Sequence, residues 1–301
     1  IMSKTKFFEI DCPICEKGTP YYVKYRANFE LESLDFAAKK TTKHMYFRNV
    51  KCKGCSLIYS SPIIPFEQIK KFYETAYFLE LDQLETMADD YEKLFFKYVP
   101  NISHDTRVLE IGCANGHFLK RLKNKAIKNF NGVEPGRKAY SKIDDSIKSY
   151  VKNDFLNDGL FAHESFNVAC SFQVFDHILE PNDFLKKVYK YLKPGGYFLQ
   201  IHHNVNSLLP TLLGSKASTF DIEHIHLWSP KTMKLILEKN GFEVVTIKNI
   251  ATGYLLGHAL ERLPIFSLLK KILINFIKWV HLDKVTIRLP IENMLILSKK
   301  K

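Results

Sequence analysis

Short apolar runs alternate with amphipathic segments through most of the second two thirds of the chain. The runs at 166–172, 197–201 and 242–250 have the length and the aromatic and β-branched content of buried strands. Segments 117–124 and 181–192 show apolar residues every three or four positions, as in helices that cover one face of a sheet. This alternation predicts an α/β fold with a Rossmann-like, doubly wound sheet.

The first 62 residues have a different pattern, dominated by two Cys-x-x-Cys pairs, Cys12 with Cys15 and Cys52 with Cys55. Zn²⁺ prefers four thiolates in a tetrahedron, and each such turn presents two. The pairs therefore predict a structural zinc site in a small ribbon module. A redox dithiol is disfavoured because neither pair lies at a strand-to-helix junction, and a disulfide framework because no secretion signal is recognisable.

One strand runs into a turn of small residues, in the sequence VLEIGCANG at 108–116. Small side chains at 112, 114 and 116 let backbone N–H groups approach a ligand closely. A nicotinamide-binding fingerprint needs glycine at the sixth position of this turn, which His117 occupies here. The interpretation as a dinucleotide-binding turn therefore fails at this position.

The same segment resembles the first motif of class I S-adenosylmethionine-dependent methyltransferases, with Ala114 in place of the usual middle glycine. By that resemblance Glu110 anchors the methionine end of the cofactor. The backbone cradle is then formed by Gly112, Cys113, Ala114 and Gly116. Read only from the local sequence, Cys113 is instead a packed core thiol, as is Cys170.

The resemblance continues in order along the chain. Glu134 follows at the spacing at which doubly wound folds place the acid that accepts the ribose hydroxyls; the alternative is a turn acid without a ligand. LKPGG at 192–196 precedes the fifth strand, as is common in the family, and the last strand, 292–298, is expected to insert antiparallel. Asn167 stands where the family usually has Asp. The remaining residues implied to line the cofactor are Pro135, Asp154, Phe155, Ser171 and Phe172, with a loop acid as the alternative for Asp154.

The cysteine pairs and the helix that follows them are similar to bacterial methyltransferases that carry an N-terminal zinc ribbon and modify sugars or other small metabolites. In that arrangement a tyrosine-bearing helix covers the cofactor pocket, which implies a role for Tyr77 and Tyr73 or, equally, core packing. We expect a zinc module at 1–62, a helical linker or lid at 63–100, and a methyltransferase domain at 101–250 with 291–301. A helical insertion at 251–290 would shape the acceptor site or a homodimer contact.

Methyl transfer to a hydroxyl profits from a general base, and histidine has a suitable pKa. His224 matches the family's histidine ahead of a helix, and His177 follows the fourth strand, so these two are the predicted catalytic residues. Structural hydrogen bonding is the alternative for each. A period of two places His224 and His226 on one side of an extended segment. Weaker candidates follow the fifth strand: His202, His203 and Asn204.

Composition adds little to this picture. The net charge of +12 comes from lysines spread along the chain, so it is weak support for nucleic acid. Segment 265–282 is apolar but contains three lysines; we expect it to pack against the core or a second subunit rather than on a membrane surface. No run is long enough to cross a bilayer, and we expect a cytoplasmic protein.

The absence of two motifs restricts the class of molecule that can be the methyl acceptor. There is no Asn/Asp-Pro-Pro-Tyr/Phe segment, which argues against methylation of exocyclic base amines, and no Pro-Cys nucleophile after the fourth strand. The sequence therefore favours O-methylation of a small molecule such as a sugar or nucleotide-sugar, with a phosphate-bearing acceptor allowed by the basic charge. An RNA methyltransferase and a non-catalytic zinc-stabilised binding protein are the two alternatives.

Overall fold

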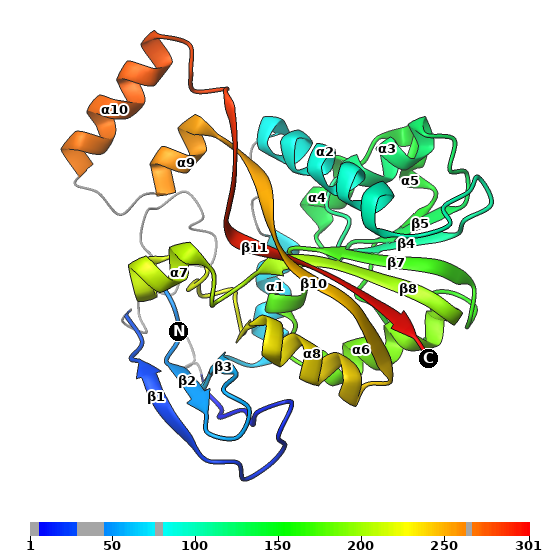
Figure 1. Cartoon of the computed structure of the whole chain (residues 1–301), viewed down its shortest axis with the longest axis horizontal. Helices are drawn as coiled ribbons and strands as arrows, with labels where there is room; N and C mark the ends of the chain where they lie inside the picture. The colour runs from blue at the N-terminus through cyan, green and yellow to red at the C-terminus, as the bar shows by residue number, and fades with distance from the viewer. Residues whose placement is uncertain (1–5, 29–44, 76–80, 263–266) are drawn as a thin grey trace.

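The computed structural model describes residues 6–28, 45–75, 81–262 and 267–301 (Figure 1). Its centre is a seven-stranded sheet in the order β10-β11-β8-β7-β4-β5-β6. The strands are β4 (Val108–Ile111), β5 (Phe130–Val133), β6 (Val151–Lys152), β7 (Phe166–Phe172), β8 (Leu192–His203), β10 (Phe242–Leu255) and β11 (Thr286–Lys300). Only β11 runs against its neighbours, pairing antiparallel with both β8 and β10. The predicted doubly wound sheet with a reversed last strand is confirmed.

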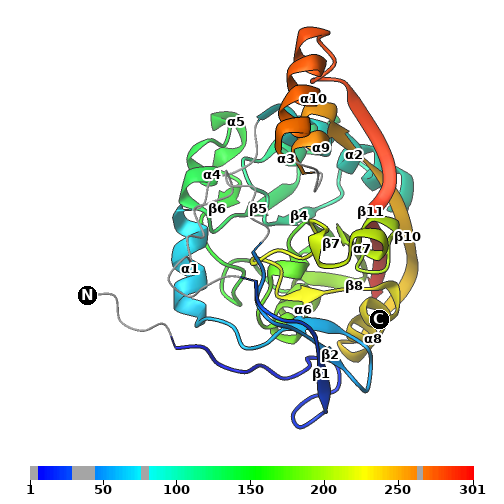
Figure 2. The ribbon, with the colours of Figure 1, turned by 90° about the vertical axis from the view of Figure 1, so that its left-hand side faces the viewer.

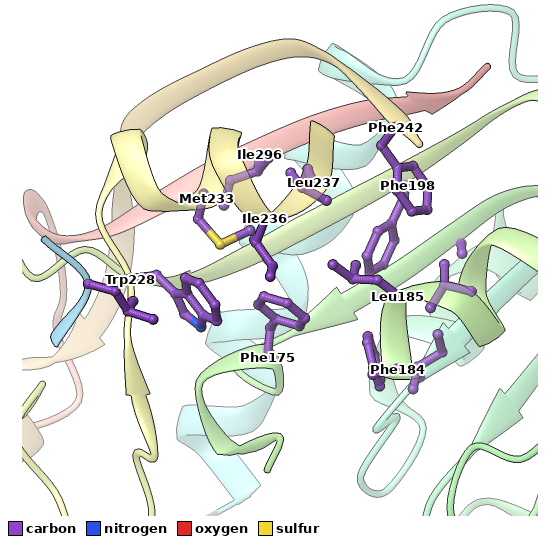
Figure 3. Close-up of a cluster of buried hydrophobic side chains, with 14 of the residues drawn as sticks. Phe175, Phe184, Leu185, Phe198, Trp228, Met233, Ile236, Leu237, Phe242 and Ile296 are labelled. Atoms are coloured by element: carbon purple, nitrogen blue, oxygen red, sulfur yellow. The ribbon is translucent and has the colours of Figure 1, made fainter. Parts of the chain in front are cut away.

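Helices cover both faces of this sheet. On one face, α6 (Pro181–Tyr191) and α8 (Pro230–Lys239) bury apolar side chains against β7, β8 and β11, including Phe184, Ile236 and Leu237 (Figure 3). On the other face, α2 (Leu81–Tyr98) and α3 (His117–Asn124) bury Phe95 and Phe118 against the sheet. The remaining helical elements are α1 (Phe66–Thr75), α4 (Arg137–Ser141), α5 (Asp145–Lys148), η2 (Phe175–His177), α7 (Leu208–Leu213) and η3 (Gly214–Lys216).

The N-terminal segment forms a second, four-stranded sheet with the order β1-β2-β3-β9. Its strands are β1 (Tyr21–Tyr25), β2 (Asn49–Cys52), β3 (Ile58–Ser60) and β9 (His226–Leu227). Because β9 comes from the second half of the chain, the N-terminal segment is hydrogen-bonded to the large domain through Ile58 and Tyr59. Three of the four paired cysteines also share one buried cluster with core residues such as Phe166 and Trp228.

The segment expected to be a helical insertion, 251–290, is only partly helical. β10 continues to Leu255 and β11 begins at Thr286, and the two pair beyond the end of β8 as a two-stranded ribbon. The ribbon carries α9 (Leu256–Arg262) and α10 (Ser267–Trp279) away from the sheet (Figure 1). The pairing partners are more than thirty positions apart in sequence, so no local pattern reveals that the strands extend. In the described part of the chain, no helix is both long and apolar enough to cross a membrane.

Candidate active site

The turn after β4 has backbone angles that favour glycine. Gly112 and Gly116 have φ values of +73° and +76°, and Ala114 adopts the same region at +48°. A Cβ on Gly112 would come within 2.4 Å of a methyl group of Val174, so a side chain there requires the backbone to move. The turn leads directly into α3, which places the positive end of a helix next to it.

Glu134, at the end of β5, ties this turn to its neighbour. One carboxylate oxygen accepts the N–H of Ala114 at 2.8 Å and the other accepts the N–H of Gly136 at 2.7 Å. Burial raises the pKa of Glu134 to about 7, although the two N–H donors favour the ionised form. A buried carboxylate thus lies beside the glycine turn, with Pro135 half-buried next to it.

Glu110 is the second buried acid at this edge of the sheet. Its Oε2 has no hydrogen-bond partner among the described residues. Burial, and then the nearby charge of Glu134, raise its pKa well above the usual range. A buried, unpartnered carboxyl oxygen is costly unless a ligand completes it. The pair of acids and the small-residue turn therefore fit a cofactor that carries an amino group and a ribose.

Cys113 contributes to the core rather than to the cradle. Its thiol is buried against Gly132, and its N–H donates to the carbonyl of Val133 at 3.1 Å. Both of its polar groups are thus directed into the protein. The packed-thiol interpretation of Cys113 agrees with this geometry, and Cys170 is buried in the same cluster.

The residues after β6 form a loop of their own. Asp154 is exposed, and its oxygens accept the N–H of Phe155 at 2.7 Å and the amide of Asn157 at 3.1 Å. Phe155 packs edge-on against Phe66 of α1, with ring centroids 5.8 Å apart. These contacts are those of a loop acid, and the binding of the cofactor by Asp154 stays a prediction. Asn153, which the sequence did not single out, donates to the carbonyl of Glu134 at 2.7 Å.

Ser171 and Phe172 face opposite sides of β7. The hydroxyl of Ser171 is buried and has no hydrogen-bond partner within the described chain. The ring of Phe172 stacks on Tyr91 at a centroid distance of 4.3 Å and contacts Phe118 edge-on, so it belongs to the core beneath α2 and α3. Tyr77 lies outside the described residues, and the side chain of Tyr73 is likewise not described.

Three histidines surround a fully buried carboxylate at the ends of β7 and β8. Asp176 Oδ2 lies 2.8 Å from His203 Nδ1 and 3.6 Å from His224 Nε2, and Asp176 Oδ1 lies 3.7 Å from His177 Nε2. Burial alone would raise the pKa of Asp176, but the surrounding imidazoles outweigh it and hold the pKa well below its usual range. The two predicted histidines are therefore brought together, with ring centroids 4.8 Å apart.

Two further acids surround this histidine cluster. Glu223 Oε2 is 3.8 Å from His177 Nδ1, and Glu292 Oε1 is 3.7 Å from His203 Nε2. Glu292 comes from β11, where the ribbon also supplies Tyr254, whose hydroxyl donates to Glu292 at 3.3 Å. No role for Asp176 or Glu292 was predicted from the sequence, and His203 was only a weak candidate. The one feature of the sequence that pointed to these residues is that each lies just after a predicted strand or within one.

His226 and His202 are structural, in contrast to the expectation that His226 shares a face with His224. His226 is buried between Tyr59 and Trp228, and its Nδ1 contacts the carbonyl of Ile178 at 3.0 Å. Burial lowers the pKa of both His226 and His202 to about 4, so both are neutral at pH 7. The short strand β9 turns His226 toward the core and leaves His224 at the cluster.

Two groups of side chains could hold a metal ion. The four sulfurs of Cys12, Cys15, Cys52 and Cys55 lie within 4.8 Å of one another, close to the roughly 3.8 Å edge of a tetrahedral zinc–thiolate site. Gly54 permits this approach, because a Cβ there would lie 2.9 Å from the sulfur of Cys15. The residues present thus fit a structural zinc ion. The second group is the histidine cluster itself, through Asp176, His177 and His224.

Comparisons with known proteins agree with this arrangement. A family model described as a methyltransferase domain matches residues 78–247. A ubiquinone biosynthesis O-methyltransferase from Ralstonia nicotianae is 29% identical over 118 residues, covering 36% of this chain and 49% of that protein. A sterol 24-C-methyltransferase from Clavispora lusitaniae is 33% identical over 113 residues, covering 35% of this chain and 30% of that protein. The chain therefore spans half or less of the length of these two relatives.

Longer matches exist at lower identity. The ubiquinone/menaquinone biosynthesis C-methyltransferase UbiE from Rickettsia felis is 24% identical over 200 residues, covering 55% of this chain and 79% of that protein. Among solved structures, a protein from Bacillus halodurans described as a methyltransferase superposes with a TM-score of 0.52 at 16% identity, covering 70% of this chain and 99% of that one. At this identity the structural likeness shows the fold alone.

Proposed function

This chain belongs to the methyltransferase-domain family, and we propose on that premise that it transfers a methyl group from S-adenosylmethionine to a hydroxyl of a small molecule such as a sugar. The observation that supports this most is the pair of buried acids, Glu110 and Glu134, beside the turn at Gly112. The histidine cluster around Asp176 supplies a base at the same edge of the sheet. Of the three relatives described above, two are named for ubiquinone biosynthesis and one for a sterol, so all three are named for small organic acceptors.

In this proposal Glu134 accepts the ribose hydroxyls, Glu110 holds the amino end of the methionine part, and Gly112 and Gly116 allow close backbone approach. S-adenosylmethionine, when bound, supplies an electrophilic methyl group on a sulfonium. The protein then holds the acceptor oxygen in line with that methyl group and removes the acceptor's proton.

His224 has the hydrogen bonds of a general base. Its Nδ1 lies 2.8 Å from the carbonyl oxygen of Thr219, so Nδ1 carries the proton and donates it to that carbonyl. In the neutral imidazole with this tautomer, Nε2 is the acceptor nitrogen and takes the proton of the acceptor hydroxyl. The imidazolium that results lies 3.6 Å from the Oδ2 of Asp176, whose negative charge stabilises it.

The proposal is tested by measuring S-adenosylhomocysteine release with the purified chain and a panel of acceptors. The panel should contain sugars, nucleotide-sugars, phosphorylated metabolites, polyprenyl phenols and RNA. Product formed with a hydroxylated small molecule, and located on oxygen by NMR, supports the proposal. Turnover only with RNA, or binding of S-adenosylmethionine without turnover of any acceptor, contradicts it.

The affinity for S-adenosylmethionine should increase with pH. Ribose hydroxyls donate to the ionised form of Glu134, whose pKa is about 7, so the proton competes with the cofactor at lower pH. Between pH 8 and pH 6 the Kd should therefore rise about tenfold, measured by isothermal titration calorimetry.

The control for this prediction is a pair of matched variants. Glu134→Gln should bind more weakly and lose the pH dependence, whereas Glu243→Gln, at an exposed position of β10, should behave as the wild type. A Kd for the wild type that stays constant from pH 6 to pH 8 would show that Glu134 does not hold the cofactor.

A further inference from the structure

Helix α10 exposes a continuous apolar stripe on its outer side. The stripe consists of Leu268, Leu269, Ile272, Phe276 and Trp279. Leu268, Ile272, Phe276 and Trp279 follow one another at intervals of three and four, and Leu269 comes three positions before Ile272, so all five share one side of the helix. Trp279 and Leu268 are 76% and 71% exposed. Among the described side chains of α10, only Ile277 is buried, so the segment does not pack on the core of its own chain, and packing on a second subunit stays a prediction.

The position of α10 keeps this stripe away from the other described parts of the chain. α10 packs against α9, and both helices are held at one end of the molecule by the β10–β11 ribbon (Figures 1 and 2). Leu282, Val285 and Leu289, which follow α10 toward and into β11, are also exposed. A contiguous apolar surface of this kind marks a binding site for another molecule or for a membrane.

The charges next to the stripe indicate what it binds. Lys271 and Lys278 are both exposed and lie seven positions apart on one line along α10, beside the stripe. Lys270 reaches the carbonyl of Glu261 at 2.8 Å and thus fixes α10 to α9. From 265 to 285 the sequence contains four lysines and a single acid, Asp283. We propose that α10 binds flat on an anionic lipid bilayer, with the stripe among the acyl chains and the lysines at the headgroups.

Two features favour a bilayer over a second copy of the chain. Two α10 helices packed stripe to stripe would bring equal rows of lysine close together, and like charges at that distance repel. Anionic headgroups instead neutralise these lysines, and their long side chains reach the headgroups while the apolar stripe stays buried. The helix has 13 residues and is about 20 Å long, which suits a helix lying in the interface and is too short to cross the bilayer.

Bilayer binding would also position the candidate active site. The ribbon that carries α9 and α10 is the same one that supplies Tyr254 and Glu292 to the histidine cluster. Glu292 is only six positions after the start of β11, about 20 Å along an extended strand. The docking itself stands on α10 alone and does not depend on the proposed reaction.

The tryptophan content gives a direct test. The chain has two tryptophans, and Trp228 is fully buried in the core, so a change in emission on adding vesicles reports Trp279. The full chain is titrated with vesicles of phosphatidylcholine alone and of phosphatidylcholine with 30% phosphatidylglycerol, and binding is measured by flotation and by tryptophan emission. We expect a blue shift and flotation with the anionic vesicles, and at least tenfold weaker binding at 0.5 M salt or with phosphatidylcholine alone.

Matched variants separate the contribution of the apolar stripe to bilayer binding from that of the lysines. Phe276→Ser should weaken binding at least tenfold, and Lys271→Glu combined with Lys278→Glu should abolish the preference for anionic lipid. Val245→Ser, at an exposed apolar position of β10, should bind as the wild type. The proposal is overturned if the wild type fails to bind anionic vesicles or if Phe276→Ser binds equally well. A wild-type dimer that Phe276→Ser converts to a monomer, without vesicle binding, would assign the stripe to a second copy instead.

Discussion

Replacing His224 by alanine is expected to lower kcat between about 10²- and 10⁴-fold, the usual contribution of a general base. The imidazole is held by the carbonyl of Thr219 on one side and lies near Asp176 on the other, so the substitution removes a base that is held in position. Because the glycine turn and Glu134 are untouched, the Kd for S-adenosylmethionine should stay within about twofold. The measurement is S-adenosylhomocysteine release with the acceptor found in the screen.

Asp176→Asn tests whether the negative charge of Asp176 contributes to the proposed mechanism. The substitution preserves shape but removes the negative charge that stabilises an imidazolium, so kcat should fall and the pH at which activity rises should move downward. A merely structural carboxylate would change stability without moving the pH profile. Asp176 is in this sense a positioning residue, acting through His224 and His203.

The control for both variants is His163→Ala, which removes an exposed histidine whose ring contacts Tyr191. It should retain full activity. If His224→Ala turns over at the wild-type rate while still binding cofactor, His224 is not the base. If EDTA abolishes wild-type activity and Mg²⁺ or Mn²⁺ restores it, then Asp176, His177 and His224 hold a metal ion instead.

Replacing Cys55 by serine should release the bound zinc and lower the Tm by more than about 10 °C. A tetrahedral thiolate site with three ligands binds Zn²⁺ far more weakly, and metal-binding free energy is folding free energy for such a site. The loss should spread beyond the N-terminal segment, because Cys55, Cys52 and Cys12 share a buried cluster with Phe166 and Trp228. Zinc content by mass spectrometry and thermal unfolding by circular dichroism measure the two effects.

Cys170→Ala is the matched substitution for this experiment, since Cys170 is a buried thiol in β7 outside the four-cysteine group. It should keep about one zinc per chain and cost only about 1–2 kcal/mol, the range for deleting a small buried group. Wild-type protein purified without zinc, and equally stable after chelation, would contradict the structural zinc site.

Local patterns were sufficient to locate several elements of the large domain. β7 begins and ends where the sequence predicted, at Phe166–Phe172, and α3 (His117–Asn124) begins at the predicted residue. An apolar run bounded by polar residues, and a small-residue turn followed by an amphipathic segment, are both set by neighbours in the chain. The length of β10 was underestimated, because its last residues pair with β11 across the whole of α9 and α10.

In the candidate site, too, some contacts could be predicted from the sequence and others only from the tertiary structure. Glu134 was placed next to the glycine turn from sequence, because the carboxyl ends of adjacent parallel strands meet at one edge of a sheet. The partners of His224 were not found, because Asp176, His203 and Glu292 come from η2, β8 and β11 and meet only after folding. Phe172 faces the core for a related reason, since its neighbours Tyr91 and Phe118 lie on α2 and α3.

The sequence by itself determined the doubly wound sheet, the glycine turn with its acids, and the two cysteine pairs, because each depends on spacing along the chain. Only the tertiary structure decided which histidines lie against Asp176, that the N-terminal segment joins the core through β9, and that the stripe on α10 is exposed among the described residues. Burial and the pairing of distant strands are properties of the packed chain, and they determine whether a histidine is neutral, charged or available as a base.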